Sequence, residues 1–212
     1  MWDHKKSLNK YIKEWNNITM IAVGMSRSGK SYLVEHFVTE NIKLWDFIVI
    51  FSSTGGFDKI KTKFRYEEVN DALIQAFKKK YEKSKKKFRV LYIVDDLLSL
   101  SLKYKEELNK LFLTGRHYGA SIIILAQKLS MLSQAWFANT TMFAILFSGS
   151  IKEKEYISEN VLMNIDNKKD WIKIQTEFCI NFRAIIVIPM EYTISAYKVH
   201  STDGADHQKS IF

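Results

Sequence analysis

Short apolar runs alternate along the chain with longer segments in which apolar residues recur at helical spacing. Five of the runs are nearly continuous in aliphatic and aromatic residues, which is typical of strands buried on both faces of a parallel sheet. We expect these strands at residues 18–23, 47–51, 90–94, 121–126 and 142–147. Repeated alternation of strand and helix predicts an α/β fold with a mostly parallel central sheet and helices on both faces.

The helical segments show their apolar face at intervals of three and four residues. Leu33, Phe37 and Val38 share one face of a predicted helix at residues 32–42. Beyond residue 170 the pattern changes, and residues 171–178 and 183–188 look like two strands joined by a short turn, forming an antiparallel hairpin at one edge of the sheet. We expect one domain over residues 1–198 and a polar tail over residues 199–212.

Residues 24–31 match the phosphate-loop pattern G-x-x-x-x-G-K-[ST] in full. The motif follows the first predicted strand and precedes a predicted helix, which is the context that it requires. Its glycines let the backbone N–H groups converge on phosphates, and the helix N-terminus adds a favourable dipole. We expect Lys30 to reach the β- and γ-phosphates of a nucleotide and the Ser31 hydroxyl to bind Mg²⁺. The predicted nucleotide-binding residues are Gly24, Met25, Ser26, Arg27, Ser28, Gly29, Lys30 and Ser31.

Two carboxylates, Asp95 and Asp96, follow the predicted strand at residues 90–94. In P-loop enzymes the first acid after this strand holds Mg²⁺ and a second acid activates the attacking water. We therefore expect Asp95 to take the metal role and Asp96 the role of general base. The alternative is a strand-terminal turn or a helix cap, because Asp favours both.

A polar segment at residues 115–120 leads into the predicted strand at 121–126, which Gln127 follows. We expect Gln127 to sense the γ-phosphate or to orient the attacking water, and an ordinary surface strand end is the alternative. Arg116 is a candidate for an arginine finger, acting in its own subunit or across a subunit boundary; a surface ion pair is the alternative. His117 is expected to face solvent or to pack.

Composition adds a preference for polyanions. The net charge is +9, with nucleic acid the commonest partner of such basic chains. The single cysteine and five scattered histidines suggest neither a disulfide nor a metal cluster. No apolar run approaches the length of about 18 residues that a membrane span needs, and the start of the chain does not resemble a secretory signal. The sequence therefore predicts no membrane association and a reducing, cytoplasmic location.

Seven lysines fall between residues 78 and 87. As a DNA-contacting loop, this run would neutralise backbone phosphates without reading bases. As a solvated connector it needs no partner. Both interpretations remain open, and Lys85, Lys86 and Lys87 are the candidate DNA contacts.

Residues 167–170 match the N-K-x-D pattern by which GTPases recognise guanine. Two features of the context argue against that interpretation. The preceding residues, 161–166, look like a helix end and not like a buried strand, and Leu98 stands where a GTPase carries glycine.

With these motifs in this order, the chain resembles the FtsK-HerA branch of P-loop ATPases and, more narrowly, the poxvirus A32-like packaging ATPases. The resemblance depends on residues 24–31, on Asp95-Asp96, and on the run Arg-His-x-x-x-Ser at 116–121 that leads to Gln127. One position departs from the pattern: Phe137 stands two residues before Asn139, where members often carry a basic residue. That departure shifts the expected finger role to Arg116.

The resemblance implies a three-layer P-loop NTPase of the ASCE/RecA-like type that hydrolyses ATP with Mg²⁺ and packages double-stranded DNA into a viral capsid. It also implies a homo-oligomeric ring, a pentamer or hexamer, that meets a capsid portal or vertex protein in the host cytoplasm, at assembling virions. The alternatives are a phage-assembly or plasmid-transfer ATPase and a nucleotide-gated binding switch. DNA stimulation of hydrolysis distinguishes among them.

Overall fold

Strands and helices alternate through the part of the chain that the structure, a computed structural model, describes: residues 17–95, 102–161, 168–179, 183–189 and 193–198. The chain forms two compact units. Unit 1 comprises residues 17–19 and 34–125, and unit 2 comprises residues 20–33 and the described residues from 126 onward.

Unit 1 contains four parallel strands in the order β3-β2-β4-β5, namely β2 (Phe47–Phe51), β3 (Phe64–Tyr66), β4 (Val90–Val94) and β5 (Ala120–Ala126). Every residue of β4 and β5 is buried, as their continuous apolar sequences predict. The short strand β3 was not predicted, because it has three residues and none of them is buried.

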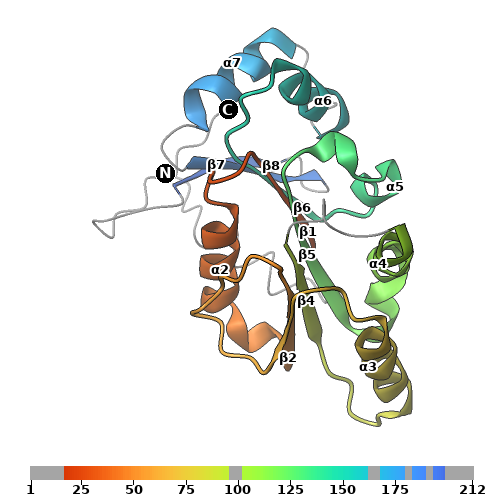
Figure 1. Ribbon diagram of the computed structural model, residues 1–212. Coiled ribbons are helices and arrows are strands. Elements are labelled where there is room, and N and C mark those ends of the chain that lie inside the picture. Colours follow the sequence, from red (N-terminus) through yellow and green to blue (C-terminus); the bar gives the residue numbers. More distant parts are fainter. Residues whose placement is uncertain (1–16, 96–101, 162–167, 180–182, 190–192, 199–212) are drawn as a thin grey trace. The chain divides into compact units, whose positions relative to one another are not determined.

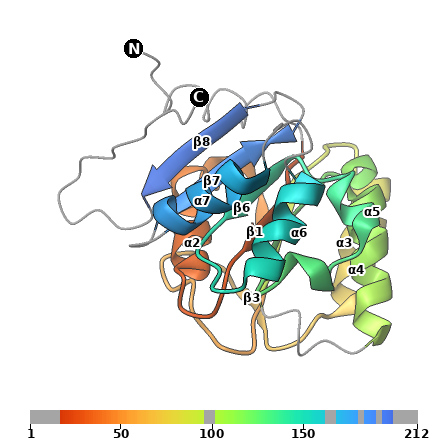
Figure 2. The ribbon, with the colours of Figure 1, turned by 90° about the horizontal axis from the view of Figure 1, so that it is seen from above.

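Helices cover both faces of the unit 1 strands (Figures 1 and 2). α3 (Asp71–Lys83) and α4 (Leu102–Thr114) lie on one face, and the second half of α2 (Lys30–Glu40) lies on the other. α3 begins where the Asn70 side chain accepts a hydrogen bond of 3.0 Å from Leu73 N, and it buries Ile74 and Phe77. Short 3-10 turns, η1 (Ile42–Leu44) and η3 (Gly115–Tyr118), complete the unit.

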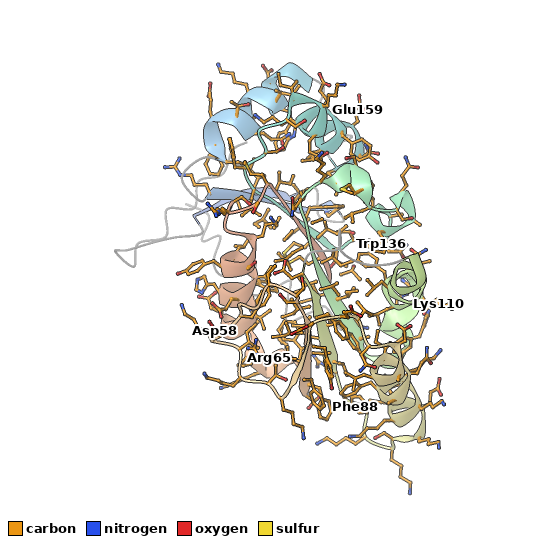
Figure 3. The ribbon with its side chains drawn as sticks, in the orientation of Figure 1. Asp58, Arg65, Phe88, Lys110, Trp136 and Glu159 are labelled. Carbon is orange, nitrogen blue, oxygen red and sulfur yellow. The ribbon has the colours of Figure 1, made fainter. Side chains whose placement is uncertain are left out.

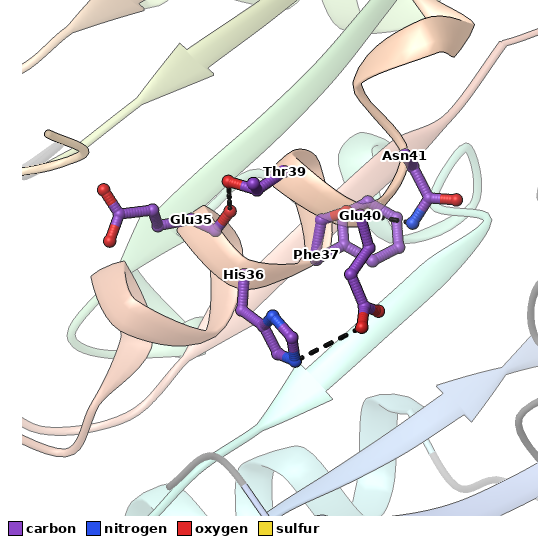
Figure 4. Close-up of polar contacts among 6 residues, drawn as sticks. All are labelled: Glu35, His36, Phe37, Thr39, Glu40 and Asn41. Atoms are coloured by element: carbon purple, nitrogen blue, oxygen red, sulfur yellow. Dashed lines mark hydrogen bonds and ion pairs between the residues drawn. The ribbon is translucent and has the colours of Figure 1, made fainter. Parts of the chain in front are cut away.

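The end of α2 is set by polar side chains that bond to its last carbonyl groups (Figure 4). Thr39 Oγ1 donates to the Glu35 carbonyl at 2.7 Å, and Asn41 Nδ2 donates to the Phe37 carbonyl at 2.9 Å. His36 and Glu40, one turn apart, approach within 3.6 Å. The Phe37 carbonyl thus accepts from both the backbone N–H of Asn41, at 3.3 Å, and its side chain, and the helix ends at Glu40 and not at residue 42 as predicted.

The loop that follows β2 is held by an arginine on β3. Arg65, labelled in Figure 3, donates from its guanidinium to the carbonyls of Gly56, Phe57 and Ile60, at 2.9, 2.5 and 2.7 Å. The buried Glu35 carboxylate accepts a hydrogen bond of 2.7 Å from Lys59 N in the same loop. A cation on the carbonyls and an anion on an amide thus fix the loop beside the carboxyl end of β2.

Unit 2 combines parallel and antiparallel pairing. β1 (Thr19–Val23) pairs in parallel with β6 (Met142–Ile145), β6 pairs antiparallel with β7 (Arg183–Ile188), and β7 pairs antiparallel with β8 (Thr193–Lys198). η4 (Leu129–Met131), α5 (Gln134–Phe137), α6 (Ile151–Val161) and α7 (Lys168–Phe178) accompany these strands. α7 packs beside α6 and against β7.

The predicted fold class is confirmed, with mostly parallel strands and a C-terminal antiparallel hairpin. One of the two hairpin strands was placed wrongly: residues 171–178 form most of α7, and the hairpin consists of β7 and β8. Trp171, Gln175 and Cys179 are buried at intervals of four, which is helical spacing. Gln175 is polar, so an apolar count misses it, although its Nε2 donates to the Lys154 carbonyl at 3.2 Å.

Two further predictions concern residues that the structure does not describe. The predicted turn near residue 180 and the predicted polar tail at 199–212 lie outside them, so the domain boundary at residue 198 stays a prediction. None of the helices in the described ranges combines the length and the apolar character that crossing a bilayer demands.

Candidate functional site

The predicted phosphate loop forms a tight turn between β1 and α2, within unit 2. β1 ends at Val23 and α2 begins at Lys30, with Leu33 N donating to the Gly29 carbonyl at 2.9 Å in its first turn. Gly29 has φ of 97° and Arg27 has φ of 62°, a left-handed conformation that is uncommon for a residue with a side chain. Alternation of right- and left-handed residues turns successive N–H groups inward, which makes an anion-binding concavity.

Gly24 is the most constrained residue of the loop. A Cβ atom at this position would lie 2.7 Å from Ser28 Oγ and 2.8 Å from Leu146 Cβ, closer than atoms can approach. Gly24 N donates to the Ala126 carbonyl at 3.2 Å, and Met25 N donates to the Phe147 carbonyl at 2.9 Å. The start of the loop is therefore tied to the ends of β5 and β6.

The Lys30 ammonium group is held inside the loop. Its Nζ donates to the carbonyls of Gly24 and Met25 at 2.8 and 2.9 Å, and the residue is 9% exposed. These two bonds compensate the burial of the charge. A phosphate would offer the same group a full negative charge in place of two neutral carbonyls, which is the stronger partner.

A buried hydroxyl in the same loop has no hydrogen-bond partner among the described residues. Ser28 is 8% exposed, and its Oγ is fully enclosed. Buried polar atoms are nearly always paired in folded proteins, so an orphaned one needs an explanation. The enclosed hydroxyl lies against Gly24, whereas the loop N–H groups and the Lys30 ammonium are the groups that fit the phosphates of a nucleotide.

Asp95 lies directly after β4 in unit 1 and is half-buried. Its backbone N–H donates to the Phe51 carbonyl at 2.9 Å, and its carboxylate accepts a hydrogen bond of 3.5 Å from Ser52 Oγ. Ser52 was not predicted, although it is the first polar residue after the neighbouring strand β2. Asp96 lies outside the described residues, so its role stays a prediction.

Gln127 follows β5 and is half-buried in unit 2. The residue before it, Ala126, accepts the hydrogen bond from Gly24 N. The residue before Gln127 therefore contacts the phosphate loop, and the role of the Gln127 side chain stays a prediction.

Arg116 and His117 are exposed in η3, at the amino end of β5. Because β4 and β5 pair in parallel, with Val90 beside Ala120, this end of the unit 1 strands is opposite to the end at which Asp95 lies. Five strand residues at about 3.3 Å each separate the two ends by roughly 16 Å. Arg116 therefore cannot reach the Asp95 of its own chain.

The lysine run occupies the same end of unit 1 as Arg116. Lys78 lies on α3, and its Nζ is 5.4 Å from the ring centroid of Tyr118 in η3. Lys87 lies 4.4 Å above the Tyr81 ring and also donates to the Tyr81 carbonyl at 3.1 Å. Part of the run thus packs on aromatic rings, and Lys85 and Lys86 are exposed.

Phe137, the position at which the sequence departs from the family pattern, belongs to an aromatic cluster in unit 2. Its ring lies 6.3 Å from that of Phe143 and 6.3 Å from that of Tyr156. The residue packs against a strand and a helix and has no charge to offer a phosphate. Lys168, Lys169 and Asp170 of the N-K-x-D match open helix α7, and residues 162–167 before them lie outside the described residues.

Comparison with known proteins decides the family. The family model described as poxvirus A32 protein matches residues 5–209, nearly the whole chain. The chain belongs to the poxvirus A32 protein family. The resemblance drawn from residues 24–31, Asp95-Asp96 and 116–127 is thereby confirmed. A search of the curated proteins found no match for this family member.

Solved structures share the fold of this A32 family member at low sequence identity. B204, the DNA-packaging ATPase of Sulfolobus Turreted Icosahedral Virus, is 16% identical with a TM-score of 0.62, over 86% of this chain and 98% of that chain. The genome packaging NTPase B204 of Sulfolobus turreted icosahedral virus 2, in complex with ATP-gammaS, is 17% identical with a TM-score of 0.61, over 93% and 99%. EssC from Geobacillus thermodenitrificans is 12% identical with a TM-score of 0.57, over 81% and 37%.

The close approach at Gly24 generates a direct test of the phosphate loop. We expect Gly24→Ala to weaken the binding of an ATP analogue by at least about tenfold, because its methyl group would push Ser28 and Leu146 apart and open the loop. Isothermal titration calorimetry measures the affinity. Gly149→Ala is the matched control, since Gly149 has open space around its Cβ position. Wild-type affinity in Gly24→Ala would show that the phosphates bind elsewhere.

Proposed function

We propose that this A32 family member is an ATP-driven motor that packages double-stranded DNA into a viral capsid. The observation that supports the proposal best is the loop at 24–29, whose left-handed residues and enclosed Lys30 ammonium are typical of an anion site, in a chain of this family. The two B204 structures of similar fold are named as a DNA-packaging ATPase and a genome packaging NTPase, the second in complex with an ATP analogue.

In the proposed mechanism Lys30 exchanges its two loop carbonyls for the β- and γ-phosphates of ATP. The loop N–H groups and the start of α2 then face the negative charge. Ser31 and Asp95 are the proposed ligands for Mg²⁺, which neutralises charge that develops on the phosphates. Ser52 keeps the Asp95 carboxylate oriented through its hydrogen bond. Asp96 takes the proton of the attacking water, and Gln127 orients that water or senses the γ-phosphate.

Arg116 has a place in this mechanism only across a subunit boundary. It lies at the end of the unit 1 strands opposite to Asp95, so a finger role requires a neighbouring subunit to present it. We therefore propose a homo-oligomeric ring, a pentamer or hexamer, that docks on a capsid portal or vertex protein. In such a ring each site is completed by the next subunit, which lets hydrolysis proceed in sequence.

The DNA-binding part of the proposal depends on charge. The chain carries a net charge of +9, and exposed Lys85 and Lys86 lie at the same end of unit 1 as Arg116. Contacts to DNA phosphates release counterions, so affinity falls steeply as salt rises. A translocating motor needs this kind of contact, because it must hold DNA of any sequence.

The decisive experiment measures ATP hydrolysis with and without double-stranded DNA. We expect DNA to stimulate the wild-type chain. Lys30→Ala should abolish hydrolysis and weaken ATP binding, because it removes the cation at the phosphates, whereas Asp96→Asn should keep ATP bound and stop turnover. An assembly ATPase would hydrolyse ATP without DNA stimulation, and a nucleotide-gated switch would release product slowly. Either result would overturn the packaging proposal, and turnover at the wild-type rate by Asp96→Asn would reassign the base.

A mixing experiment tests the finger role of Arg116. Arg116→Ala and Lys30→Ala subunits are each expected to be inactive alone. In mixed rings an intact arginine faces an intact phosphate loop at some boundaries, so hydrolysis should return. If Arg116 acts within its own chain, no chain in the mixture has both residues, and the mixture does not hydrolyse ATP. That result would contradict the role across a subunit boundary. Native mass spectrometry of the mixture confirms that mixed rings form.

The lysine run is tested with Lys85 and Lys86, two of its exposed lysines. We expect Lys85→Gln with Lys86→Gln to weaken binding to a double-stranded oligonucleotide several-fold. The slope of log affinity against log salt concentration should fall by about one for each lysine that contacts a DNA phosphate. Unstimulated hydrolysis should not change. The control, Lys152→Gln with Lys173→Gln, removes the same charge from exposed positions on α6 and α7. Equal affinities in the two double variants would identify the run as a solvated connector.

A further inference from the structure

Glu153, near the start of α6, has a buried carboxylate that bonds to a distant segment and not to its own helix end. Residues 150–153 read Ser-x-x-Glu, the pattern of a capping box at a helix start. Half of the box is present, since Glu153 N donates to Ser150 Oγ at 3.3 Å. The Ser150 N–H, however, donates to Ser148 Oγ at 3.4 Å, and the Glu153 carboxylate turns away toward η4. Helix capping therefore does not explain where this carboxylate lies.

The carboxylate holds the start of η4. Glu153 Oε1 accepts hydrogen bonds from Leu129 N and, at 3.4 Å, from Ser130 N, while its Oε2 accepts one of 2.8 Å from Ser130 Oγ. Glu153 is 4% exposed. Burying a carboxylate is costly unless donors surround it, and here two successive residues supply three. The contact joins residues that are 24 positions apart in the chain.

The segment that Glu153 holds is the one that bears Gln127. Ala126, on one side of Gln127, accepts the hydrogen bond from Gly24 N. Leu129, on the other side, donates to Glu153. The start of α6 is in turn connected to the phosphate loop, because Phe147 accepts the hydrogen bond from Met25 N. Together with the chain segments 126–129 and 147–153, these hydrogen bonds form a closed ring within unit 2 that contains the phosphate loop, Gln127 and Glu153.

We infer that Glu153 is a positioning residue that fixes Gln127 beside the phosphate loop. This inference rests on the proposed ATPase function. Glu153 need not touch the nucleotide, because it acts through Leu129 and Ser130. Loss of this tether leaves residues 127–131 attached to the phosphate loop at one end only, so the Gln127 side chain samples other positions. A misplacement of about 1 Å in a catalytic group lowers turnover up to about a hundredfold.

Kinetics of paired variants test the role. We expect Glu153→Ala to lower kcat by at least about tenfold while the affinity for an ATP analogue changes less than about twofold. Glu153→Gln should keep more activity, since its amide oxygen still accepts the backbone N–H groups. Glu155→Ala and Glu155→Gln, at an exposed position of the same helix, should match wild type.

A coupling measurement separates positioning from a general loss of stability. Gln127→Ala combined with Glu153→Ala should lower kcat no further than Gln127→Ala alone, because both changes remove the same positioned group. If the two effects multiply, or if Glu153→Ala has wild-type kcat, the inference is wrong. If Glu153→Ala does not fold, Glu153→Gln is used in the same cycle.

Hydrogen exchange makes the test independent of hydrolysis. In Glu153→Ala, the amides of Leu129 and Ser130 should exchange faster than in wild type or in Glu153→Gln, whose amide oxygen still accepts their hydrogen bonds. Exchange at Leu146, which donates to the Val23 carbonyl, should not change. An ATP analogue should slow exchange at residues 127–130 in wild type and not in Glu153→Ala. Should the wild type fail to hydrolyse ATP, the proposed function falls, and this loss of analogue-induced protection still decides the role of Glu153. Unchanged exchange at Leu129 and Ser130 would overturn it.

Discussion

The absence of a side chain at Gly24 is the constraint on which the rest of the site depends. Its backbone lies so close to Ser28 and Leu146 that any Cβ atom would collide with both. This approach allows Gly24 N to bond to Ala126 and its carbonyl to hold Lys30. Gly24 thus joins the phosphate loop to the end of β5 through its N–H and holds the Lys30 ammonium inside the loop through its carbonyl.

In a loop fixed in this way, ligand binding would exchange the hydrogen-bond partners of Lys30 and would not require the loop to fold around the ligand. Lys30 already donates to two carbonyls, so in the proposed exchange a phosphate would contribute the difference between a charged acceptor and neutral ones. Because the same loop is bonded to the segments that lead to Gln127 and to Glu153, a change at the phosphates is felt at both.

The features that could be predicted from the sequence depend on short spacing. The phosphate loop follows from eight consecutive residues, and β4 and β5 follow from continuous apolar runs whose every residue is buried. The helix α7 was mistaken for a strand because Gln175, which completes its buried face, is polar. Ser52 with Asp95 and Glu153 with Leu129 meet across 43 and 24 residues, and no local pattern predicts such contacts. The opposite ends at which Arg116 and Asp95 lie became clear only from the parallel register of β4 and β5.

The central claim is that the phosphate loop is preformed and that Lys30 changes partners when a nucleotide binds. A crystal structure of the protein with Mg²⁺ and a non-hydrolysable ATP analogue tests it most directly. The claim predicts that Lys30 Nζ leaves the Gly24 and Met25 carbonyls for the β- and γ-phosphates, and that the bonds from Gly24 N to Ala126 and from Met25 N to Phe147 persist. An analogue bound away from residues 24–31, or a loop that breaks both of those backbone bonds to accept it, would contradict the claim.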